Sequence, residues 1–379
     1  METVRAASTT ETTAMIVVEC VDLGANLDAF VADGGFRVHV ITPADDPRRI
    51  VLDGHGVRVV LVRSERDVPV HLEIEGPMDE PSEGGWTLRT PNGSTLTLRS
   101  TSGSNGPIAE LDLPESQPTL SVVGAADGGF GVGRAGMEYR DLLPDRWGGR
   151  FIASHIAITD GGDVADWVHF HRIRFQMIFV AAGWVDVVYE DQGSPFRMEA
   201  GDCVVQPPEI RHRVLRSSAG LEVIEVGCPA EHDTIADHDL ALPTALLRPD
   251  RDFGGQRFVR HVARDASTTA WIVSGLRARE TGVGSATDGL AGAVVVSGDA
   301  ASPASSGWMR HDEEFVLCVG VRGAATLEVH GHGPVPLPER ASVALPPGTV
   351  WRWVDVDRGH EALVVSMSAD AIVGTDAPV

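Results

Sequence analysis

Short runs in which apolar and polar residues alternate recur along the chain, and most are bounded by Gly, Pro, Asp or Ser. Because side chains on a strand point alternately to opposite faces, these runs predict β-strands. The expected strands are FRVHVIT (36–42), GVRVVLV (56–62), RFIASHIAI (150–158), GWVDVVYE (183–190), DCVVQPP (202–208), AWIVSGLRA (270–278), GAVVVSG (292–298), EFVLCVGV (314–321), ATLEVHG (325–331) and ALVVSMS (362–368). Helical spacing is clear in LGANLDAFVAD, residues 23–33. The pattern is typical of mainly β proteins built as sandwiches or barrels.

Polar stretches divide the 379 residues into segments. We expect a disordered tail over residues 1–12, an α+β domain over 13–125, and two β domains over 129–240 and 250–372. The stretch RSTSGSNGPIAELDLPESQP is a loop or boundary before the first β domain, and DHDLALPTALLRPDRD links the two β domains. The predicted fold class is therefore mainly β, with a smaller α+β domain at the N-terminus.

The two β domains look like an internal repeat. When His171 is aligned with His311, Gly183 falls on Gly323 without a gap. After the removal of one residue, VVQPPEIRH (204–212) aligns with VALPPGTVW (343–351), and the Pro-Pro pairs coincide. We therefore predict the duplication of an all-β unit of about 110 residues.

Three histidines of the first β domain have the pattern of a metal site. His169 and His171 alternate, so both point to the same face of a strand. His212 follows on a later strand-like run, after the Pro-Pro pair. Three imidazoles on neighbouring strands of a closed sheet can face one point, and neutral imidazole suits several transition metals. The alternative is that they are hydrogen-bonded polar residues at a barrel mouth.

The stretches HFHRIRFQMIFVAAG and GDCVVQPPEIRHRVLR resemble the two sequence motifs of the cupin superfamily. The first motif is Gly, five residues, His-x-His, three or four residues, Glu, six residues, Gly. The second is Gly, five residues, Pro-x-Gly, two residues, His, three residues, Asn. Both occur in order, with departures. Gly162 is one residue too early, Gln176 stands in place of Glu, Glu209 in place of the second glycine, and Arg216 in place of Asn.

This resemblance implies two jelly-roll barrels in tandem, the second assigned through the repeat. It also implies that His169, His171 and His212 bind one divalent metal inside the first barrel. Fe²⁺ is the favoured metal, and Zn²⁺, Mn²⁺, Ni²⁺ and Cu²⁺ are alternatives. Three protein ligands would leave open positions for a substrate.

Gln176 changes the expected chemistry, because an amide is neutral and has no useful basicity. It is a candidate fourth ligand, or it orients a bound oxygen by a hydrogen bond, or it only hydrogen-bonds the barrel wall. Three neutral ligands around a dication would give the site a net charge of about +2, which favours an anionic or enolate-like substrate.

Two other residues are candidates for catalysis beside Gln176. Arg216 has the same parity as His212, which would allow it to face inward and clamp a substrate carboxylate. Pairing with a surface acid is the alternative. Tyr189 lies on the strand after Gly183 and either lines the barrel or packs in the core.

The other segments lack these residues. In the third segment the ligand positions hold Met309 for His169, Val316 for Gln176 and Trp351 for His212. We therefore predict no metal there and a role as scaffold. The first segment, around AFVADGGFRVHVITPADDPRRIVLDGHGVRVVLV (29–62), is similar to one βαβββ module of the glyoxalase/extradiol (vicinal oxygen chelate) superfamily, without clear metal ligands. We expect it to serve docking or oligomerisation.

The composition narrows the partners. The formal net charge of −23 repels a phosphate backbone and offers no basic patch to an anionic membrane, so we expect neither nucleic acid nor membrane as a partner. Every basic side chain is arginine or histidine, which excludes Schiff-base lysine chemistry and a P-loop lysine. The four scattered cysteines and the absence of a signal-peptide pattern predict a cytoplasmic protein, and we expect a homodimer.

The leading functional hypothesis is a mononuclear metal oxygenase of the dioxygenase type. Three-histidine members of the superfamily include dioxygenases that cleave diketone, flavonol or aromatic substrates, so the resemblance implies a small anionic or enolisable, aromatic or dicarbonyl substrate with O₂ as the second reactant. One alternative is a non-redox isomerase or lyase with the metal as Lewis acid. The other is a small-molecule-binding cupin without turnover.

Overall fold

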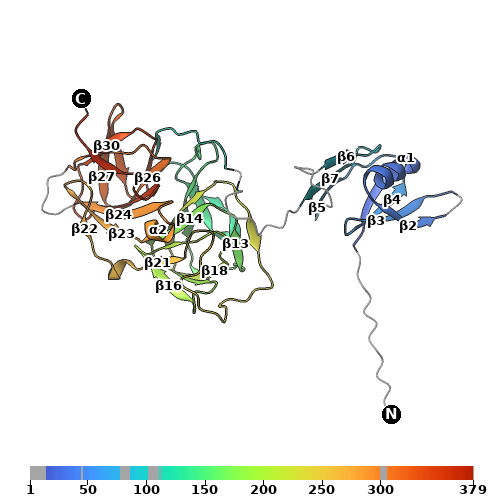
Figure 1. Cartoon of the computed structure of the whole chain (residues 1–379), viewed down its shortest axis with the longest axis horizontal. Helices are drawn as coiled ribbons and strands as arrows, with labels where there is room; N and C mark the ends of the chain where they lie inside the picture. Colours follow the sequence, from blue (N-terminus) through green and yellow to red (C-terminus); the bar gives the residue numbers. More distant parts are fainter. Residues whose placement is uncertain are drawn as a thin grey trace, which may run out of the picture. The chain divides into compact units, whose positions relative to one another are not determined.

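Figure 1 shows the computed structural model of the chain, which describes residues 14–43, 46–76, 86–100, 111, 113–298 and 305–378. The expected tail over 1–12 lies outside these residues. The chain divides into two compact units, Met1–Gly106 and Pro107–Val379. Within the described ranges, no helix has the length and apolar character needed to cross a bilayer.

The N-terminal unit opens with the βαβββ succession that the sequence predicts. Its elements are β1 (Ile16–Cys20), α1 (Leu23–Asp28), the π-helix η1 (Ala29–Asp33), β2 (Arg37–Thr42), β3 (Arg49–Gly54) and β4 (Val57–Arg63). The carboxylate of Asp22 accepts the backbone N–H of Ala25, which explains why α1 begins there. β1 pairs in parallel with β4, and the strand order is β1-β4-β3-β2. The similarity to a vicinal oxygen chelate module stays a prediction.

A second sheet of this unit was not foreseen from the sequence. It consists of β5 (His71–Gly76), β6 (Trp86–Arg89) and β7 (Thr95–Ser100), in the order β5-β7-β6. Phe30, Leu61 and Leu96 are fully buried in one hydrophobic cluster, so helix and both sheets share a single core.

The first barrel of the C-terminal unit is made of two facing sheets. One has the order β21-β17-β14-β19-β11-β10-β9, with β9 (Gly131–Val132), β10 (Glu138–Asp141), β11 (Ile152–Ile158), β14 (Phe175–Ala182), β17 (Cys203–Val205), β19 (Leu221–Cys228) and β21 (Val259–His261). The other has the order β16-β15-β18-β13-β20 with β12 beside β18, and its strands are β12 (Gly162–Asp163), β13 (His169–His171), β15 (Trp184–Tyr189), β16 (Phe196–Glu199), β18 (His212–Ser217) and β20 (Thr234–Ala236). The 3₁₀ turn η3 (Arg134–Gly136) lies between β9 and β10.

The second barrel repeats this plan. One sheet has the order β22-β23-β24-β31-β26-β29-β8, with β8 (Ser121–Val123), β22 (Thr269–Ala270), β23 (Leu276–Glu280), β24 (Gly292–Gly298), β26 (Phe315–Arg322), β29 (Ser342–Leu345) and β31 (Glu361–Met367). The other has the order β28-β27-β30-β25-β32, with β25 (Trp308–Arg310), β27 (Ala324–Val329), β28 (Gly333–Pro338), β30 (Val350–Val354) and β32 (Val373–Thr375). The short helices η4 (Ala263–Asp265) and α2 (Val283–Ala286) complete the unit.

Equivalent strands of the two barrels carry the same irregularity. The register of β14 against β19 shifts between Val180 and Ala182, and that of β26 against β31 shifts between Gly320 and Arg322. The predicted fold class, mainly β with two barrels in tandem, is confirmed. One predicted strand is wrong in detail: within 270–278 the chain reverses between β22 and β23, where Gly275 adopts a φ of +87°.

The two barrels are interlocked and share a core. β8 precedes the first barrel in sequence but pairs with β29 of the second, whereas β21 follows the first barrel's linker and pairs with β17 of the first. The sequence had placed residues 121–123 with the N-terminal segment. The rings of Phe151 and Phe315, one from each barrel, stack at a centroid distance of 4.2 Å within one hydrophobic cluster. The seven-stranded sheet of one barrel packs against the seven-stranded sheet of the other, because the outer side of each sheet is apolar and must be buried.

Candidate metal centre

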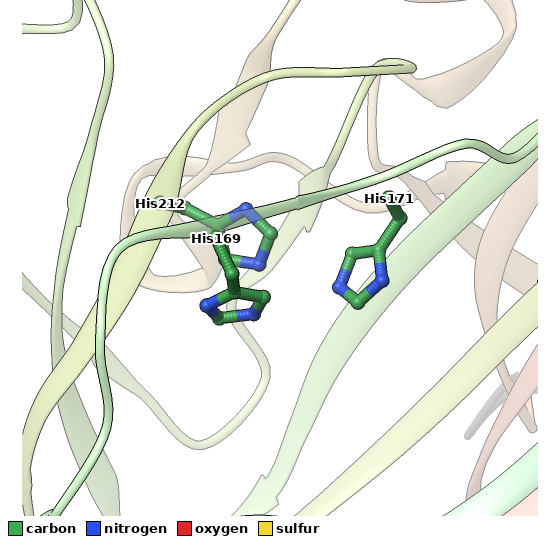
Figure 2. A group of neighbouring side chains, drawn as sticks. All are labelled: His169, His171 and His212. Carbon is green, nitrogen blue, oxygen red and sulfur yellow. The ribbon is translucent and has the colours of Figure 1, made fainter. Parts of the chain in front are cut away.

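The structure brings together the three histidines that the sequence singled out. His169 and His171 lie on β13, and His169 is directly opposite His212 at the start of β18. One potential ligand nitrogen from each ring lies within 4.8 Å of the other two, and all three residues are buried. Figure 2 shows the three rings gathered in one small region. The alternation of β13 places both of its histidines on the inner face, as expected.

Hydrogen bonds select the nitrogen that each ring offers. Nδ1 of His169 lies 2.9 Å from the carbonyl oxygen of Trp167, and Nδ1 of His212 lies 3.0 Å from that of Ile210. A carbonyl only accepts, so Nδ1 carries the proton in both rings and Nε2 keeps its lone pair. Nδ1 of His171 lies 3.0 Å from the hydroxyl oxygen of Thr234. These contacts hold the rings as outer-sphere partners do in protein metal sites.

A buried carboxylate lies behind the first of these rings. Oδ1 of Asp166 is 3.7 Å from Nδ1 of His169, and both side chains are fully buried. The two carboxylate oxygens accept the backbone N–H groups of Trp167 and Val214, each at 2.9 Å. Asp166 therefore links the segment before β13 to β18 and lies next to the histidine cluster.

A cavity of about 420 Å³ opens beside the histidines inside the first barrel. Its walls are mostly aliphatic, and they are formed by Met137, Ile156, Ile158, Ile178, Val185, Val187, Met198, Val214, Leu221 and Val223. The polar lining side chains include His171, His212, Gln176 and Glu225. An apolar chamber with a few convergent polar groups is the usual form of a small-molecule site.

Gln176 lies in this cavity, 1% exposed, on β14. Its Nε2 donates a hydrogen bond to Oε1 of Glu225 on the adjacent β19 at 2.5 Å. A carboxylate can only accept, so the amide orientation follows, and Oε1 of Gln176 is buried without a protein partner among the described residues. The bond to Glu225 is a hydrogen bond to the barrel wall, which is one of the three roles considered for Gln176. Its roles as a fourth ligand or in orienting a bound oxygen stay predictions.

Tyr189 lines the cavity and is almost fully buried. Its ring stacks on that of His212 at a centroid distance of 5.4 Å, and its hydroxyl accepts a hydrogen bond of 2.8 Å from Nε2 of Gln206. Burial raises the pKa of the Tyr189 phenol well above its usual range. Tyr189 therefore stays a neutral phenol whose own proton is available for donation.

Arg216 does not face the cavity, contrary to the expectation from parity. β15 pairs Asp186 with Arg216 but Val187 with Val214, so Leu215 is an extra residue in β18. This bulge reverses the alternation after Val214 and turns Arg216 outward. Its guanidinium is exposed and forms an ion pair of 2.9 Å with Asp163. The alternative of surface pairing is the one the structure shows.

Glu225 and His232 line the cavity, and neither was foreseen. The ring of His232 lies 5.3 Å from that of His171, centroid to centroid, and its Nδ1 is 3.1 Å from the carbonyl oxygen of Pro229. A signal for Glu225 was present in the sequence: it follows Leu221 and Val223 at alternate positions, so it falls on the inner face of an apolar strand. His232 lies in a loop, where no periodicity applies.

In the second barrel the retained histidine is tied to the backbone. Nε2 of His311 lies 2.9 Å from the carbonyl oxygen of Leu345, and the side chain is fully buried. Desolvation lowers its pKa. Met309, Val316 and Trp351, which take the places of His169, Gln176 and His212, are also fully buried.

The strand order and the inward-facing histidines define a class: the C-terminal unit has the bicupin fold, with a three-histidine cluster in its first barrel. Among solved structures, it resembles an alanine variant of the Bacillus subtilis oxalate decarboxylase OxdC, with a TM-score of 0.50 and 12% identity over 68% of this chain and 81% of that chain. A deletion variant of the same enzyme gives 0.50 and 12% over 68% and 80%. A formate complex of Lactobacillus farciminis oxalate decarboxylase gives 0.49 and 12% over 69% and 91%.

At this level of identity the likeness concerns the fold alone. No protein-family model matches the sequence, and no curated protein matches it. The chemistry of the site must therefore be argued from its own residues.

Proposed function

We propose that the chain is a metal-dependent enzyme of the dioxygenase type that acts on a small enolisable substrate. The observation that carries this proposal is the set of three imidazoles at an apolar cavity, two of which have Nδ1 directed at a backbone carbonyl oxygen. The Glu225–Gln176 and Gln206–Tyr189 pairs add polar groups at the same place.

The donor set fits a divalent transition metal. His169, His171 and His212 would hold it through neutral nitrogens, and Gln176 offers a carbonyl oxygen as a weaker fourth donor. Iron is the metal we favour. When bound, the metal would supply the Lewis acidity and redox chemistry that no side chain of the cavity can provide.

The residues of the chain would bind and orient the substrate. The aliphatic walls would enclose its body and exclude water. The phenol of Tyr189, whose oxygen already accepts from Gln206, can donate its proton to a substrate oxygen. Gln206 would thus be a positioning residue, because it holds the phenol oxygen at 2.8 Å.

A second candidate, a non-redox isomerase or lyase, is favoured by Glu225. Gln176 cannot act as a base, but the carboxylate of Glu225 lies beside it in the same cavity. A carboxylate at this place could accept a proton from an enolisable substrate. The two candidates differ in whether O₂ is consumed.

Metal analysis followed by oxygen uptake tests the proposal. The purified chain would be reconstituted anaerobically with Fe²⁺, assayed for bound metal, and mixed with aerobic 2,4-pentanedione, 1-phenyl-1,3-butanedione or a flavonol. Near-stoichiometric iron with substrate-dependent O₂ consumption is expected. Substrate conversion without O₂ uptake would favour the isomerase or lyase, and a chain that holds no metal would contradict both.

A further inference from the structure

We propose that the cavity selects chelating ligands with an apolar body and a single negative charge, and that Glu225 sets this preference against dianions such as oxalate. The inference rests on the proposed function, because it takes the metal to be held by the three histidines. It goes further in naming the class of ligand and the residue that discriminates.

The distribution of charge around the cavity is the first argument. Glu225 is the one carboxylate among the described lining residues, and none of them is an arginine. The chain contains no lysine. Four of the five arginines in the two histidine stretches are paired with acids elsewhere: Arg172 with Glu209, Arg174 with Glu314, Arg211 with Asp237 and Arg216 with Asp163. The fifth, Arg213, is exposed. A second negative charge on a ligand would therefore meet neither an arginine nor a lysine in the described lining.

The balance of charge at the histidine cluster is the second argument. Three neutral imidazoles leave the charge of a divalent metal unchanged, but one carboxylate lies beside the cluster and a second lines the cavity. Asp166 is 3.7 Å from His169, and Glu225 is hydrogen-bonded to Gln176 within the cavity. Asp166 has both oxygens engaged by backbone N–H groups, so Glu225 is the negative group that faces a ligand. A monoanion can still be attracted to the metal, whereas a dianion would bring excess negative charge beside Glu225.

The size and lining of the cavity are the third argument. Its volume of about 420 Å³ lies within the range of pockets that hold drug-sized ligands, so a two-carbon dianion would leave much of it empty. The aliphatic side chains that form most of the wall have no hydrogen-bonding groups to offer, so an apolar body is the complement that fills the space.

A matched series of chelators tests both the preference for an apolar body and the preference for a single negative charge. Acetohydroxamate, benzohydroxamate and 4-carboxybenzohydroxamate share one chelating head and differ in the body, and oxalate is the dianion for comparison. Their dissociation constants would be measured by calorimetry on the metal-loaded chain. We expect benzohydroxamate to bind at least tenfold more tightly than acetohydroxamate, and at least tenfold more tightly than its 4-carboxy analogue or oxalate.

The variant Glu225→Gln tests the role assigned to the carboxylate. It keeps the size of the side chain and removes the charge, so oxalate should gain at least tenfold in affinity while benzohydroxamate changes little. Glu209→Gln is the matched control, because it removes the same charge from a residue that pairs with Arg172 outside the cavity lining. Metal content and thermal unfolding of both variants would show that the site and fold are retained.

Each outcome has a distinct meaning. If acetohydroxamate binds but the aromatic body adds nothing, or if Glu225→Gln leaves oxalate affinity unchanged, the inference is wrong and the proposed metal centre stands. If the chain holds no metal or binds no hydroxamate, the proposed function fails first. A wild-type preference for oxalate over benzohydroxamate would overturn the inference directly.

Discussion

The two barrels of the C-terminal unit have the same strand order and the same register shift between their central strands, yet positions that line the histidine cavity of the first are filled by apolar side chains in the second. In the first, Ile178 pairs with Glu225 and Tyr189 with His212. In the second, the same places in the register hold Cys318 with Val364, and Val329 with Trp351. Four positions of the cavity wall have become side chains of a single hydrophobic cluster.

This difference shows what a polar cavity requires of a barrel. In the first barrel the buried NH₂ groups of Gln176 and Gln206 each have a partner, because they donate hydrogen bonds to Glu225 and Tyr189, respectively. In the second barrel no such pairs are needed, because dispersion contacts of Trp351 and its neighbours fill the space. The candidate site is thus formed by particular side chains on a barrel backbone that also folds when apolar residues replace them.

The largest expected effect is on metal binding, which should respond to a histidine substitution in the first barrel and not to one in the second. His171→Ala removes one of the three proposed ligands and should weaken metal affinity by more than the about 10–100-fold typical of changes to outer-sphere groups. His311→Ala, at the equivalent place in the second barrel, should leave the bound metal unchanged. Elemental analysis after dialysis measures both, and retention of metal by His171→Ala would contradict the assignment.

The loss of stability caused by shortening an inward-facing side chain should also differ between the barrels. Leu337 is fully buried in the packed barrel, and Met198, its counterpart, faces the cavity of the first. Leu337→Ala should lower the free energy of unfolding by about 2–5 kcal/mol, because it opens a new void. Met198→Ala should cost less than about 2 kcal/mol, because one side of the residue already faces open space. Chemical denaturation compares the two, and equal costs would argue against a hollow first barrel.

Acid should destabilise the second barrel through the protonation of His360. The side chain is fully buried, and desolvation lowers its pKa to about 4 from an ordinary value of about 6.5. The folded chain thus keeps this imidazole neutral where the unfolded chain takes up a proton, so stability is lost as the pH falls from about 6.5 to 4. The loss from this group should reach about 2–3 kcal/mol at the acid end.

Denaturation at pH 7 and pH 4.5 measures this loss. His360→Phe should be less sensitive to acid than the wild type by about that amount. His330→Gln, at an exposed histidine of the same barrel, serves as the control and should not change the pH dependence. Equal pH dependence of His360→Phe and wild type would refute the prediction.

The smallest expected effect is at Arg216, on the outer face of the first barrel. Its ion pair with Asp163 is exposed, so Arg216→Ala should change the free energy of unfolding by no more than about 1 kcal/mol. Metal content should be unchanged, since the side chain points away from the histidines. A loss of metal or of ligand binding in this variant would show that Arg216 turns inward in solution.

Spacing along strands carried most of the sequence prediction of the site. His169 and His171 could be found because β13 alternates regularly. His212 could be found because the second motif places a histidine at this position, which is the first residue of β18. Arg216 was misplaced because one extra residue in β18 reverses the parity, and a bulge leaves no mark in the pattern of apolar residues. Glu225 was overlooked because it lies on the last long strand of the barrel, beyond both motifs, although its parity was readable.

The positions of most strands in the two repeats could be predicted from the sequence, whereas the pairing of strands that lie far apart in the chain could not. Alternating runs located β11, β15, β26 and β31 because each buries one or both faces in a core. The partner of a short strand depends on tertiary structure instead. Nothing local to residues 121–123 indicates that they pair with β29, more than 200 positions further along the chain.

The crossed pairing of β8 and β21 limits how this protein can be dissected. A cut in the linker at 237–252 would leave the first barrel without β21 and the second without β8, since each lies on the wrong side of the cut. Both fragments would then expose the bare backbone edges of β17 and β29, which invite intermolecular pairing. Expression of either barrel alone would therefore require the missing edge strand to be grafted back, and the smallest portable module is the pair of barrels together.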